Sequence, residues 1–74
     1  MLYLVFNTHG EAYVANAIIT LNMRLAGDVT VQWAEVRERL DGKFVIPKPE
    51  EDVMQYVTGF TEEEYSAEWF ESGE

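Results

Sequence analysis

The sequence predicts a small α+β domain with β-α-β-β order and a three-stranded sheet. Its 74 residues allow one domain. The apolar pattern changes from short strand-like runs near residues 2–6 and 43–46 to helical spacing over residues 8–25. Asp41-Gly42 is a hairpin signal between two strand-like stretches. We therefore expect one main helix on one face of the sheet, followed by a short helical acidic C-terminal segment.

The first two predicted elements are a strand and a helix. Residues 2–6 form an apolar run of strand formers. Thr8 followed by Glu11 is a capping-box pattern that predicts the start of a helix, and Gly27 predicts its end. The side chains expected to face the sheet are Val14, Ala17, Ile18, Leu21 and Leu25. The polar side chains expected to face solvent are Asn16, Thr20 and Arg24.

A hairpin should follow. Residues 29–33 alternate apolar and polar, and the strand is expected to continue to Leu40. A two-residue type I′ turn at Asp41-Gly42 then leads into residues 43–46, and Pro47 ends the strand. In this register Leu40 faces Lys43. The side chains then expected on the helix face are Val31, Trp33, Phe44 and Ile46.

Two strand orders are compatible with this pattern. The first strand pairs either in parallel with the first hairpin strand or antiparallel with the second. We favour the second order, because Phe44, Val45 and Ile46 supply apolar side chains to both faces, as in a central strand. One helix covers only one sheet face. The other face then needs a cover, which is the C-terminal segment, a second copy in a homo-oligomer, or a protein partner.

The formal net charge of −9 lies entirely in the C-terminal third. Residues 1–49, the predicted β-α-β-β core, hold five acids and five bases, whereas residues 50–74 hold nine acids and no base. This balance argues against direct binding to nucleic acid or to an anionic membrane, and it favours a basic protein partner. Within the segment we expect a helix from Glu50 to Gly59 and a second helix start at residues 61–64. The apolar stripe expected on the first of these helices is Val53, Met54, Val57 and Phe60.

Half of the ten aromatic residues also lie in this acidic segment. One interpretation is that they pack onto the open sheet face, and the other is that some anchor a partner. The candidate partner-binding residues are Tyr65, Trp69, Phe70, Glu62, Glu63 and Glu64.

Nothing in the sequence indicates catalysis, a cofactor or a metal. There is no cysteine, and His9 is the only histidine, with no second ligand at metal-binding spacing. No glycine-rich phosphate motif is present, and Thr8 is explained as a helix cap. Residues 1–6 lack the basic start of a signal peptide, and the apolar runs are too short for a membrane span. We expect a protein that is not an enzyme.

Three stretches carry a resemblance to a known group of proteins. They are Asn16-Ala17 with Asn22-Met23, then residues 29–34, then residues 41–49. Together they resemble small uncharacterised proteins encoded by tailed bacteriophages, often among tail or tail-fibre genes. The resemblance covers roughly residues 2–49. It implies a phage accessory or structural protein in the virion or the bacterial cytoplasm.

Two functions therefore compete. The first is binding to another phage protein, such as a tail or tail-fibre component or an assembly factor. The second is inhibition of a basic host site by an acidic DNA mimic or anti-defence protein. Presence in purified virions distinguishes the first function from the second.

Overall fold

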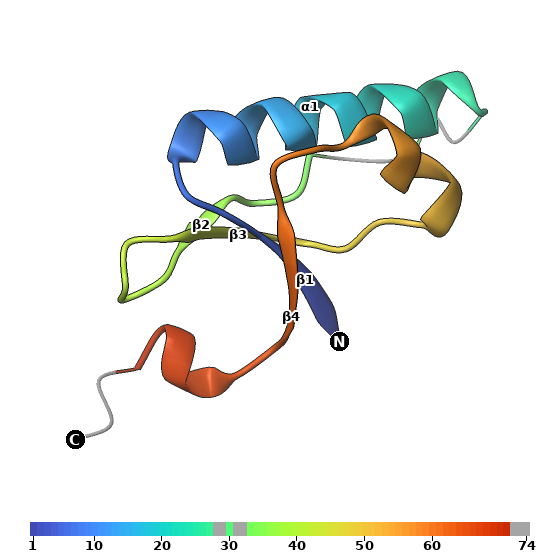
Figure 1. Ribbon diagram of the computed structural model, residues 1–74. Helices are drawn as coiled ribbons and strands as arrows, with labels where there is room; N and C mark the ends of the chain where they lie inside the picture. Colours follow the sequence, from blue (N-terminus) through green and yellow to red (C-terminus); the bar gives the residue numbers. More distant parts are fainter. Residues whose placement is uncertain (28–29, 31–32, 72–74) are drawn as a thin grey trace.

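The computed structural model describes residues 1–27, 30 and 33–71, and it confirms a small α+β domain with one main helix (Figure 1). Its sheet has four antiparallel strands in the order β2-β3-β1-β4, where three strands were predicted. The elements are β1 (Leu2–Phe6), α1 (His9–Leu25), β2 (Arg37–Glu38), β3 (Phe44–Pro47), the 3-10 helix η1 (Glu51–Tyr56), β4 (Thr61–Glu64) and the 3-10 helix η2 (Ala67–Trp69).

The favoured strand order is confirmed for β1 and β3. The two strands pair antiparallel with Leu4 opposite Ile46, and β3 also pairs with β2. Strand β3 therefore has neighbours on both sides, and Val45 and Ile46 are buried on opposite faces. The sequence of residues 44–46, which offers apolar side chains to both faces of the sheet, correctly predicted this internal position for β3.

The prediction of a helix start at residues 61–64 is wrong. These residues form β4, which pairs antiparallel with β1 and places Thr61 opposite Val5. Gly59, at a φ of 76°, lies in the turn that leads into the strand. The capping pattern is a local preference, whereas β1 would otherwise leave a row of backbone groups unpaired along its edge. Pairing with that edge outweighs the local helical signal.

The predicted register of the hairpin is wrong by one residue. Arg37 lies opposite Val45, and the backbone N–H of Arg39 donates to the carbonyl of Lys43 at 2.7 Å. The loop therefore has three residues instead of two. Gly42 has a φ of 86°, and none of the described residues other than glycine has a positive φ, so Asp41 does not adopt the type I′ conformation. A three-residue loop with glycine in the left-handed position explains the shift.

The long first hairpin strand is also not observed, because β2 is limited to two residues. Residues 29, 31 and 32 of that predicted strand lie outside the described residues. Trp33 is not in a strand, and its side chain is 44% exposed. The centre of its ring lies 5.6 Å from the centre of the Tyr13 ring of α1. Its predicted position on the helix face of the sheet is therefore wrong.

Helix α1 begins and ends where the sequence predicts. The Thr8 hydroxyl accepts a hydrogen bond from the Glu11 backbone N–H at 3.2 Å, and it donates to the Glu11 carboxylate at 3.0 Å. At the other end Gly27, with a φ of 109°, donates its N–H to the carbonyl of Arg24. These contacts satisfy backbone groups that a helix end leaves without intrahelical partners.

The predicted rotation of α1 about its axis is wrong. The side chains that are buried are Ala12, Ala15, Asn16, Ile19 and Thr20. Two of these were assigned to solvent, whereas Val14 is 56% exposed and Leu21 is 54% exposed. Small alanines let the helix lie close to the sheet. The Asn16 side chain satisfies its amide by donating to the Ala34 carbonyl at 2.6 Å.

The main core lies between α1, η1 and one face of the sheet. Leu4, Phe6 and Ile46 supply the strand side. Phe44 packs against the same cluster, which confirms the predicted facing of Phe44 and Ile46. The predicted apolar stripe of residues 53–60 also packs here, although the helix is the short η1. In Figure 1, η1 lies below the C-terminal half of α1.

Candidate functional site

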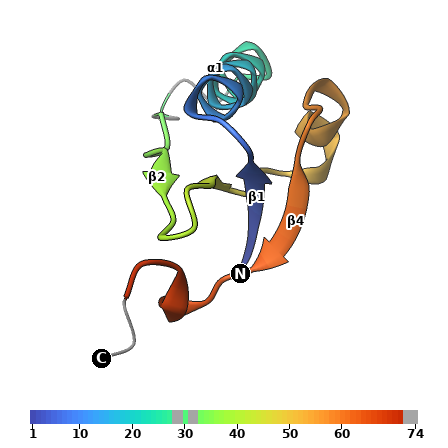
Figure 2. The same cartoon turned by 60° about the vertical axis from the view of Figure 1, so that its left-hand side comes forward.

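The sheet face opposite α1 is covered by the C-terminal segment. Viewed from two directions, α1 and η2 lie on opposite sides of the strands (Figures 1 and 2). The Tyr3 ring contacts the Trp69 ring edge-on at 5.6 Å and the Tyr65 ring at 5.8 Å. Val5 and Val45, which point to this face, are buried. The cover of this face is therefore the C-terminal segment of the same chain, which is one of the three possibilities considered from the sequence.

Two arginines fasten this aromatic cover to the sheet. The Arg37 guanidinium carbon lies 3.6 Å from the centre of the Phe70 ring, and that of Arg39 lies 5.1 Å from the Trp69 ring. The backbone N–H of Leu40 also donates to the Trp69 carbonyl at 2.8 Å. Cation–π contacts of this kind are attractive because the ring face carries partial negative charge.

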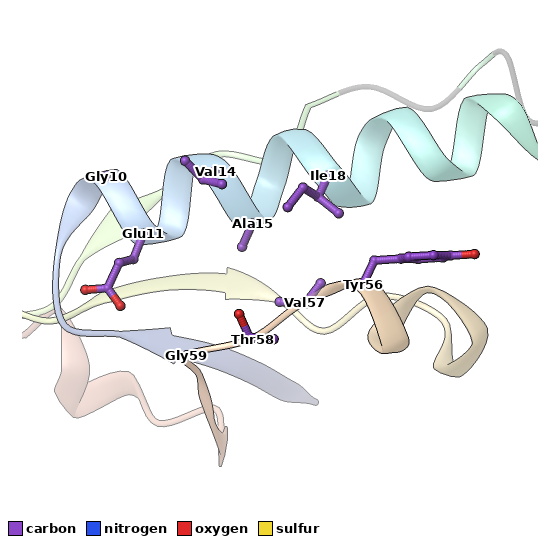
Figure 3. A pocket seen from close by; sticks show the side chains of 9 residues that line it. All are labelled: Gly10, Glu11, Val14, Ala15, Ile18, Tyr56, Val57, Thr58 and Gly59. Carbon is purple, nitrogen blue, oxygen red and sulfur yellow. The ribbon is translucent and has the colours of Figure 1, made fainter.

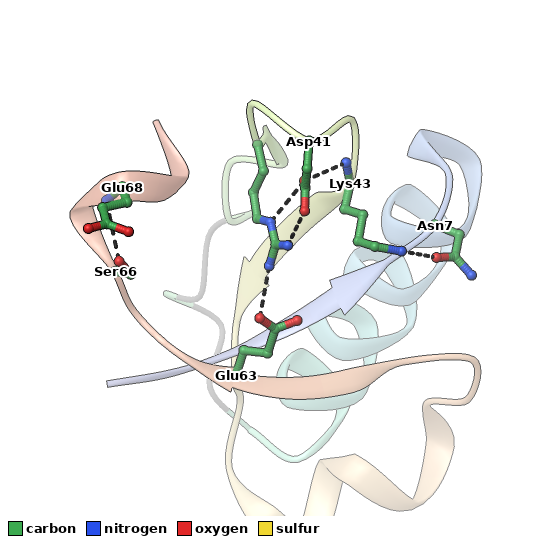
Figure 4. A network of polar contacts seen from close by, with 7 residues as sticks. Asn7, Asp41, Lys43, Glu63, Ser66 and Glu68 are labelled. Carbon is green, nitrogen blue, oxygen red and sulfur yellow. Dashed lines mark hydrogen bonds and ion pairs between the residues drawn. The ribbon is translucent and has the colours of Figure 1, made fainter. Parts of the chain in front are cut away.

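Arg39 is also the centre of a charged network, and its partners Asp41 and Glu63 are labelled in Figure 4. Its guanidinium donates to the carboxylates of Asp41 and Glu63, the second at 3.1 Å. The hydrogen bond from Arg39, together with one from the Lys43 backbone N–H, lowers the pKa of Asp41 to about 2, and the hydrogen bond to Asp41 raises the pKa of Arg39. Lys43 adds to the network through its backbone N–H to Asp41 and its ammonium to Asn7. The network joins the hairpin loop to β4.

The other two candidate glutamates are also paired within the chain. Glu62 accepts from the Lys48 ammonium at 3.1 Å, and this is the leading cause of the raised pKa of Lys48. Glu64 lies 2.5 Å from the amino group of Met1. The run of acids at residues 62–64 is therefore a set of ion pairs along β4, and its carboxylates are partly neutralised.

The six predicted site residues are thus brought together, and each of them contacts another part of the chain. Tyr65 is still 45% exposed, and Trp69 and Phe70 are half-buried. Their binding to a partner stays a prediction, since the same contacts also complete the fold.

A second candidate surface lies on the outer side of α1. The side chains that form it are Val14, Ile18, Leu21 and Leu25, which we call the outer stripe. They recur at spacings of four, three and four residues, which places them on one face of a helix. Leu25 is 85% exposed. The sequence did reveal this stripe, but it was assigned to the core because α1 carries two apolar faces.

A groove runs beside the outer stripe (Figure 3). Its volume is about 330 Å³, and it is lined by Gly10, Glu11, Val14, Ala15, Ile18 and residues 56–59. Figure 3 shows Glu11 at one end and Tyr56 at the other. Tyr56 is 51% exposed, so it extends the apolar surface beyond α1.

The groove offers an apolar surface and little reactive chemistry. Glu11 is its one carboxylate and also caps α1. His9 lies outside the groove, with its ring edge-on to Phe44 at 5.5 Å. Within the described ranges no group of three or more histidine, aspartate or glutamate side chains is arranged to hold a metal ion. Nor does any helix there reach the length and hydropathy of a membrane span.

Comparison of the chain with protein-family models, with curated proteins and with solved structures finds no match.

Proposed function

We propose that the protein is a non-enzymatic binding domain that acts as a phage accessory or structural protein. Its partner is another phage protein, such as a tail or tail-fibre component or an assembly factor. It would act in the virion or in the cytoplasm of the bacterial host. The phage origin rests on the resemblance of residues 2–49, and the binding role rests on the outer stripe of α1.

The outer stripe supports this proposal because it is apolar, lies on a helix, and has three exposed side chains, Val14, Leu21 and Leu25. Single exposed apolar residues are common on protein surfaces, whereas a row of them beside a groove is typical of an interaction site. Leu21 and Leu25 have over half of their surface in solvent. Covering such side chains by a partner provides the driving force for association.

The alternative proposal is an acidic inhibitor of a basic host protein. It is supported by exposed acids that form no ion pair within the described part of the chain, namely Glu50, Asp52, Glu68 and Glu71. The pairing of Glu62, Glu63 and Glu64 counts against it, because a phosphate mimic needs charges that its target can reach. We therefore rank this proposal second.

Site-specific photo-crosslinking during infection tests the proposed function. A crosslinking residue replaces Leu21 on the outer stripe, and a control replaces Leu40, which is 64% exposed on the hairpin loop. We expect one phage protein to crosslink from position 21 and not from position 40. Mass spectrometry of purified virions then determines whether this protein and the crosslinked phage protein are both present at fixed stoichiometry. A crosslink from position 21 to a basic host protein alone would favour the inhibitor.

A further inference from the structure

We infer that the outer edge of β4 pairs with an extended, cationic strand of a partner protein. Strand β4 lies at one end of the sheet, with β1 on its inner side and no described strand on its outer side. In Figure 2 it forms the margin of the sheet on the side away from β2. This edge is separate from the outer stripe, so binding here is independent of the contact proposed for α1.

The backbone of β4 leaves hydrogen-bonding groups unpaired along this edge. In an antiparallel pair, residues that exchange hydrogen bonds with the neighbouring strand alternate with residues whose backbone groups point away. Tyr65 donates its N–H to the carbonyl of Met1, directly opposite, at 2.9 Å. Glu63 therefore also faces β1, whereas Glu62 and Glu64 direct their N–H and C=O groups outward. Unpaired groups of this kind are a template for a further strand.

The other side of β1 gives the same alternation independently. Lys48 donates its N–H to the Leu2 carbonyl at 3.1 Å, so Leu2 and Leu4 direct their backbone groups toward β3. Tyr3, between them, directs its groups toward β4, where it lies opposite Glu63. Both sides of β1 thus agree on which residues of β4 are left unpaired.

The opposite edge of the sheet, at β2, is less suited to strand addition. Strand β2 has two residues, against four in β4. Just after β2, the backbone N–H of Leu40 already donates to the Trp69 carbonyl. In β4, by contrast, Glu62 and Glu64 are both exposed. The longer and more accessible edge is therefore that of β4.

The charges beside this edge favour a cationic strand. The ion pairs around β4 join five carboxylates to three cations, so the group keeps an excess of negative charge. The carboxylates are those of Asp41, Glu51, Glu62, Glu63 and Glu64, and the cations are Arg39, Lys48 and the amino group of Met1.

Two of these carboxylates are placed to meet the incoming side chains. Glu62 and Glu64 lie two residues apart and so share one face of β4. Their ion pairs each use the oxygen Oε1, and a carboxylate has a second oxygen that can accept from a further donor. Lysine or arginine at alternate positions of the added strand would lie directly beside them, as in other cross-strand pairs of opposite charge.

A second copy of the chain is a poorer occupant of this edge. Pairing of β4 with β4 of another copy would bring glutamate beside glutamate in any register that overlaps residues 62–64, and like charges directly opposite each other are destabilising. Pairing of β4 with β2 of another copy would leave the same two edges free at its ends, and would continue into a filament without closing. The strand therefore comes from a different protein.

A designed peptide tests the inference with the full chain. The probe has about seven residues, alternating lysine and valine, and spans about 23 Å when extended. Two controls carry N-methyl groups on the backbone, one at the lysines and the other at the valines, so both keep every charge. Because each blocks one edge of the peptide strand, we expect one control to bind at least about tenfold more weakly than the probe and the other to bind like it. Calorimetry measures the three affinities.

Hydrogen exchange of the backbone amides locates the contact. In the free protein the amides of Glu62 and Glu64 should exchange quickly, and those of Glu63 and Tyr65 slowly, because only the latter pair reaches acceptors on β1. Saturating peptide should slow the exchange of Glu62 and Glu64 at least about tenfold. The amide resonance of Leu21, on the outer stripe, should not shift.

Matched variants at one position separate backbone pairing from charge. Glu64→Gln and Glu64→Pro remove the same charge, but proline also removes the outward N–H. Proline is tolerated at an edge position whose N–H faces solvent, and circular dichroism checks the fold. We expect Glu64→Pro to weaken peptide binding about tenfold or more and Glu64→Gln about threefold. Glu71→Gln, which removes an exposed charge beyond η2, should leave binding nearly unchanged.

Three outcomes would overturn the inference. Equal binding of the probe and both N-methylated peptides would show charge attraction without strand pairing. Peptide-induced shifts on the outer stripe in place of β4 would show that the edge is not the site. A dimer in sedimentation that Glu64→Pro dissociates would make a second copy the occupant. The crosslink from position 21 tests the proposed function separately, so either can fail while the other stands.

Discussion

Trp69→Ala should destabilise the fold strongly, because the C-terminal segment is an integral cover of the sheet. The Trp69 ring contacts Tyr3, Tyr65 and Phe70, and Arg39 lies over its face. Truncation of a fully buried tryptophan costs about 3–5 kcal/mol. An aromatic pair contributes about 0.5–1.5 kcal/mol beyond the area it buries. Since Trp69 is half-buried, we expect a loss of about 2–3 kcal/mol.

This loss is a substantial fraction of the total stability of the domain. For a chain of 74 residues the free energy of unfolding is of the order of 4–11 kcal/mol. Urea unfolding followed by circular dichroism gives the difference between variant and parent, with the slope expected to stay the same.

Trp33→Ala is the matched control for this substitution. The Trp33 side chain is 44% exposed and has Tyr13 as its described ring contact. Its truncation should cost less than about 1 kcal/mol. If the two substitutions lower the free energy of unfolding by the same amount, the C-terminal segment is not an integral part of the fold. Trp69 would then again be a candidate residue for binding a partner.

Three further predictions concern the loop, its charge and the buried amide. Gly42→Val should cost about 1–2 kcal/mol in thermal melts, because a β-branched residue resists a φ of 86°, whereas Gly10→Ala, with open space around it, should not destabilise. The folded-state pKa of Asp41 is about 2 against an ordinary 3.8, so its stabilising effect is complete above about pH 4 and is lost as the pH falls toward 2. Asp41→Asn should remove this loss of unfolding free energy between about pH 4 and pH 2, as measured by urea unfolding at each pH. A variant whose stability falls with pH as that of the parent does would show that the ion pair between Arg39 and Asp41 is not formed. Asn16→Ala should cost about 1–3 kcal/mol in urea unfolding, because the Ala34 carbonyl loses its donor, and a variant as stable as the parent would contradict this.

The acidic residues show what the composition reveals and what only the structure reveals. The sequence locates the whole net charge after residue 49, and this remains true of the folded chain. It does not show that Glu62, Glu63 and Glu64 would meet cations at positions 48, 39 and 1, which are distant along the chain. These pairings arise only when β4 joins the edge of β1.

Local chemistry was sufficient for the ends of the main elements. Thr8 with Glu11 starts α1, and Gly27 follows its last turn, because capping depends on groups within about four residues of each other. The apolar run at residues 44–46 likewise indicated an internal strand, since side chains alternate between faces whatever the rest of the chain does.

Tertiary packing decided the rotation of α1 and the strand structure of residues 61–64, while the conformation of the hairpin loop decided its register. Helix α1 carries two apolar faces, and the small side chains of Ala12 and Ala15, with the Asn16 bond to Ala34, determined which one meets the sheet. The conformation of Gly42 set the loop length and hence the register. The rotation of α1 and the pairing of residues 61–64 with β1 depend on the free energy of contact between segments far apart in sequence, which no local pattern contains. The exposed outer stripe, and with it the candidate binding surface, is a consequence of the rotation that packing selected.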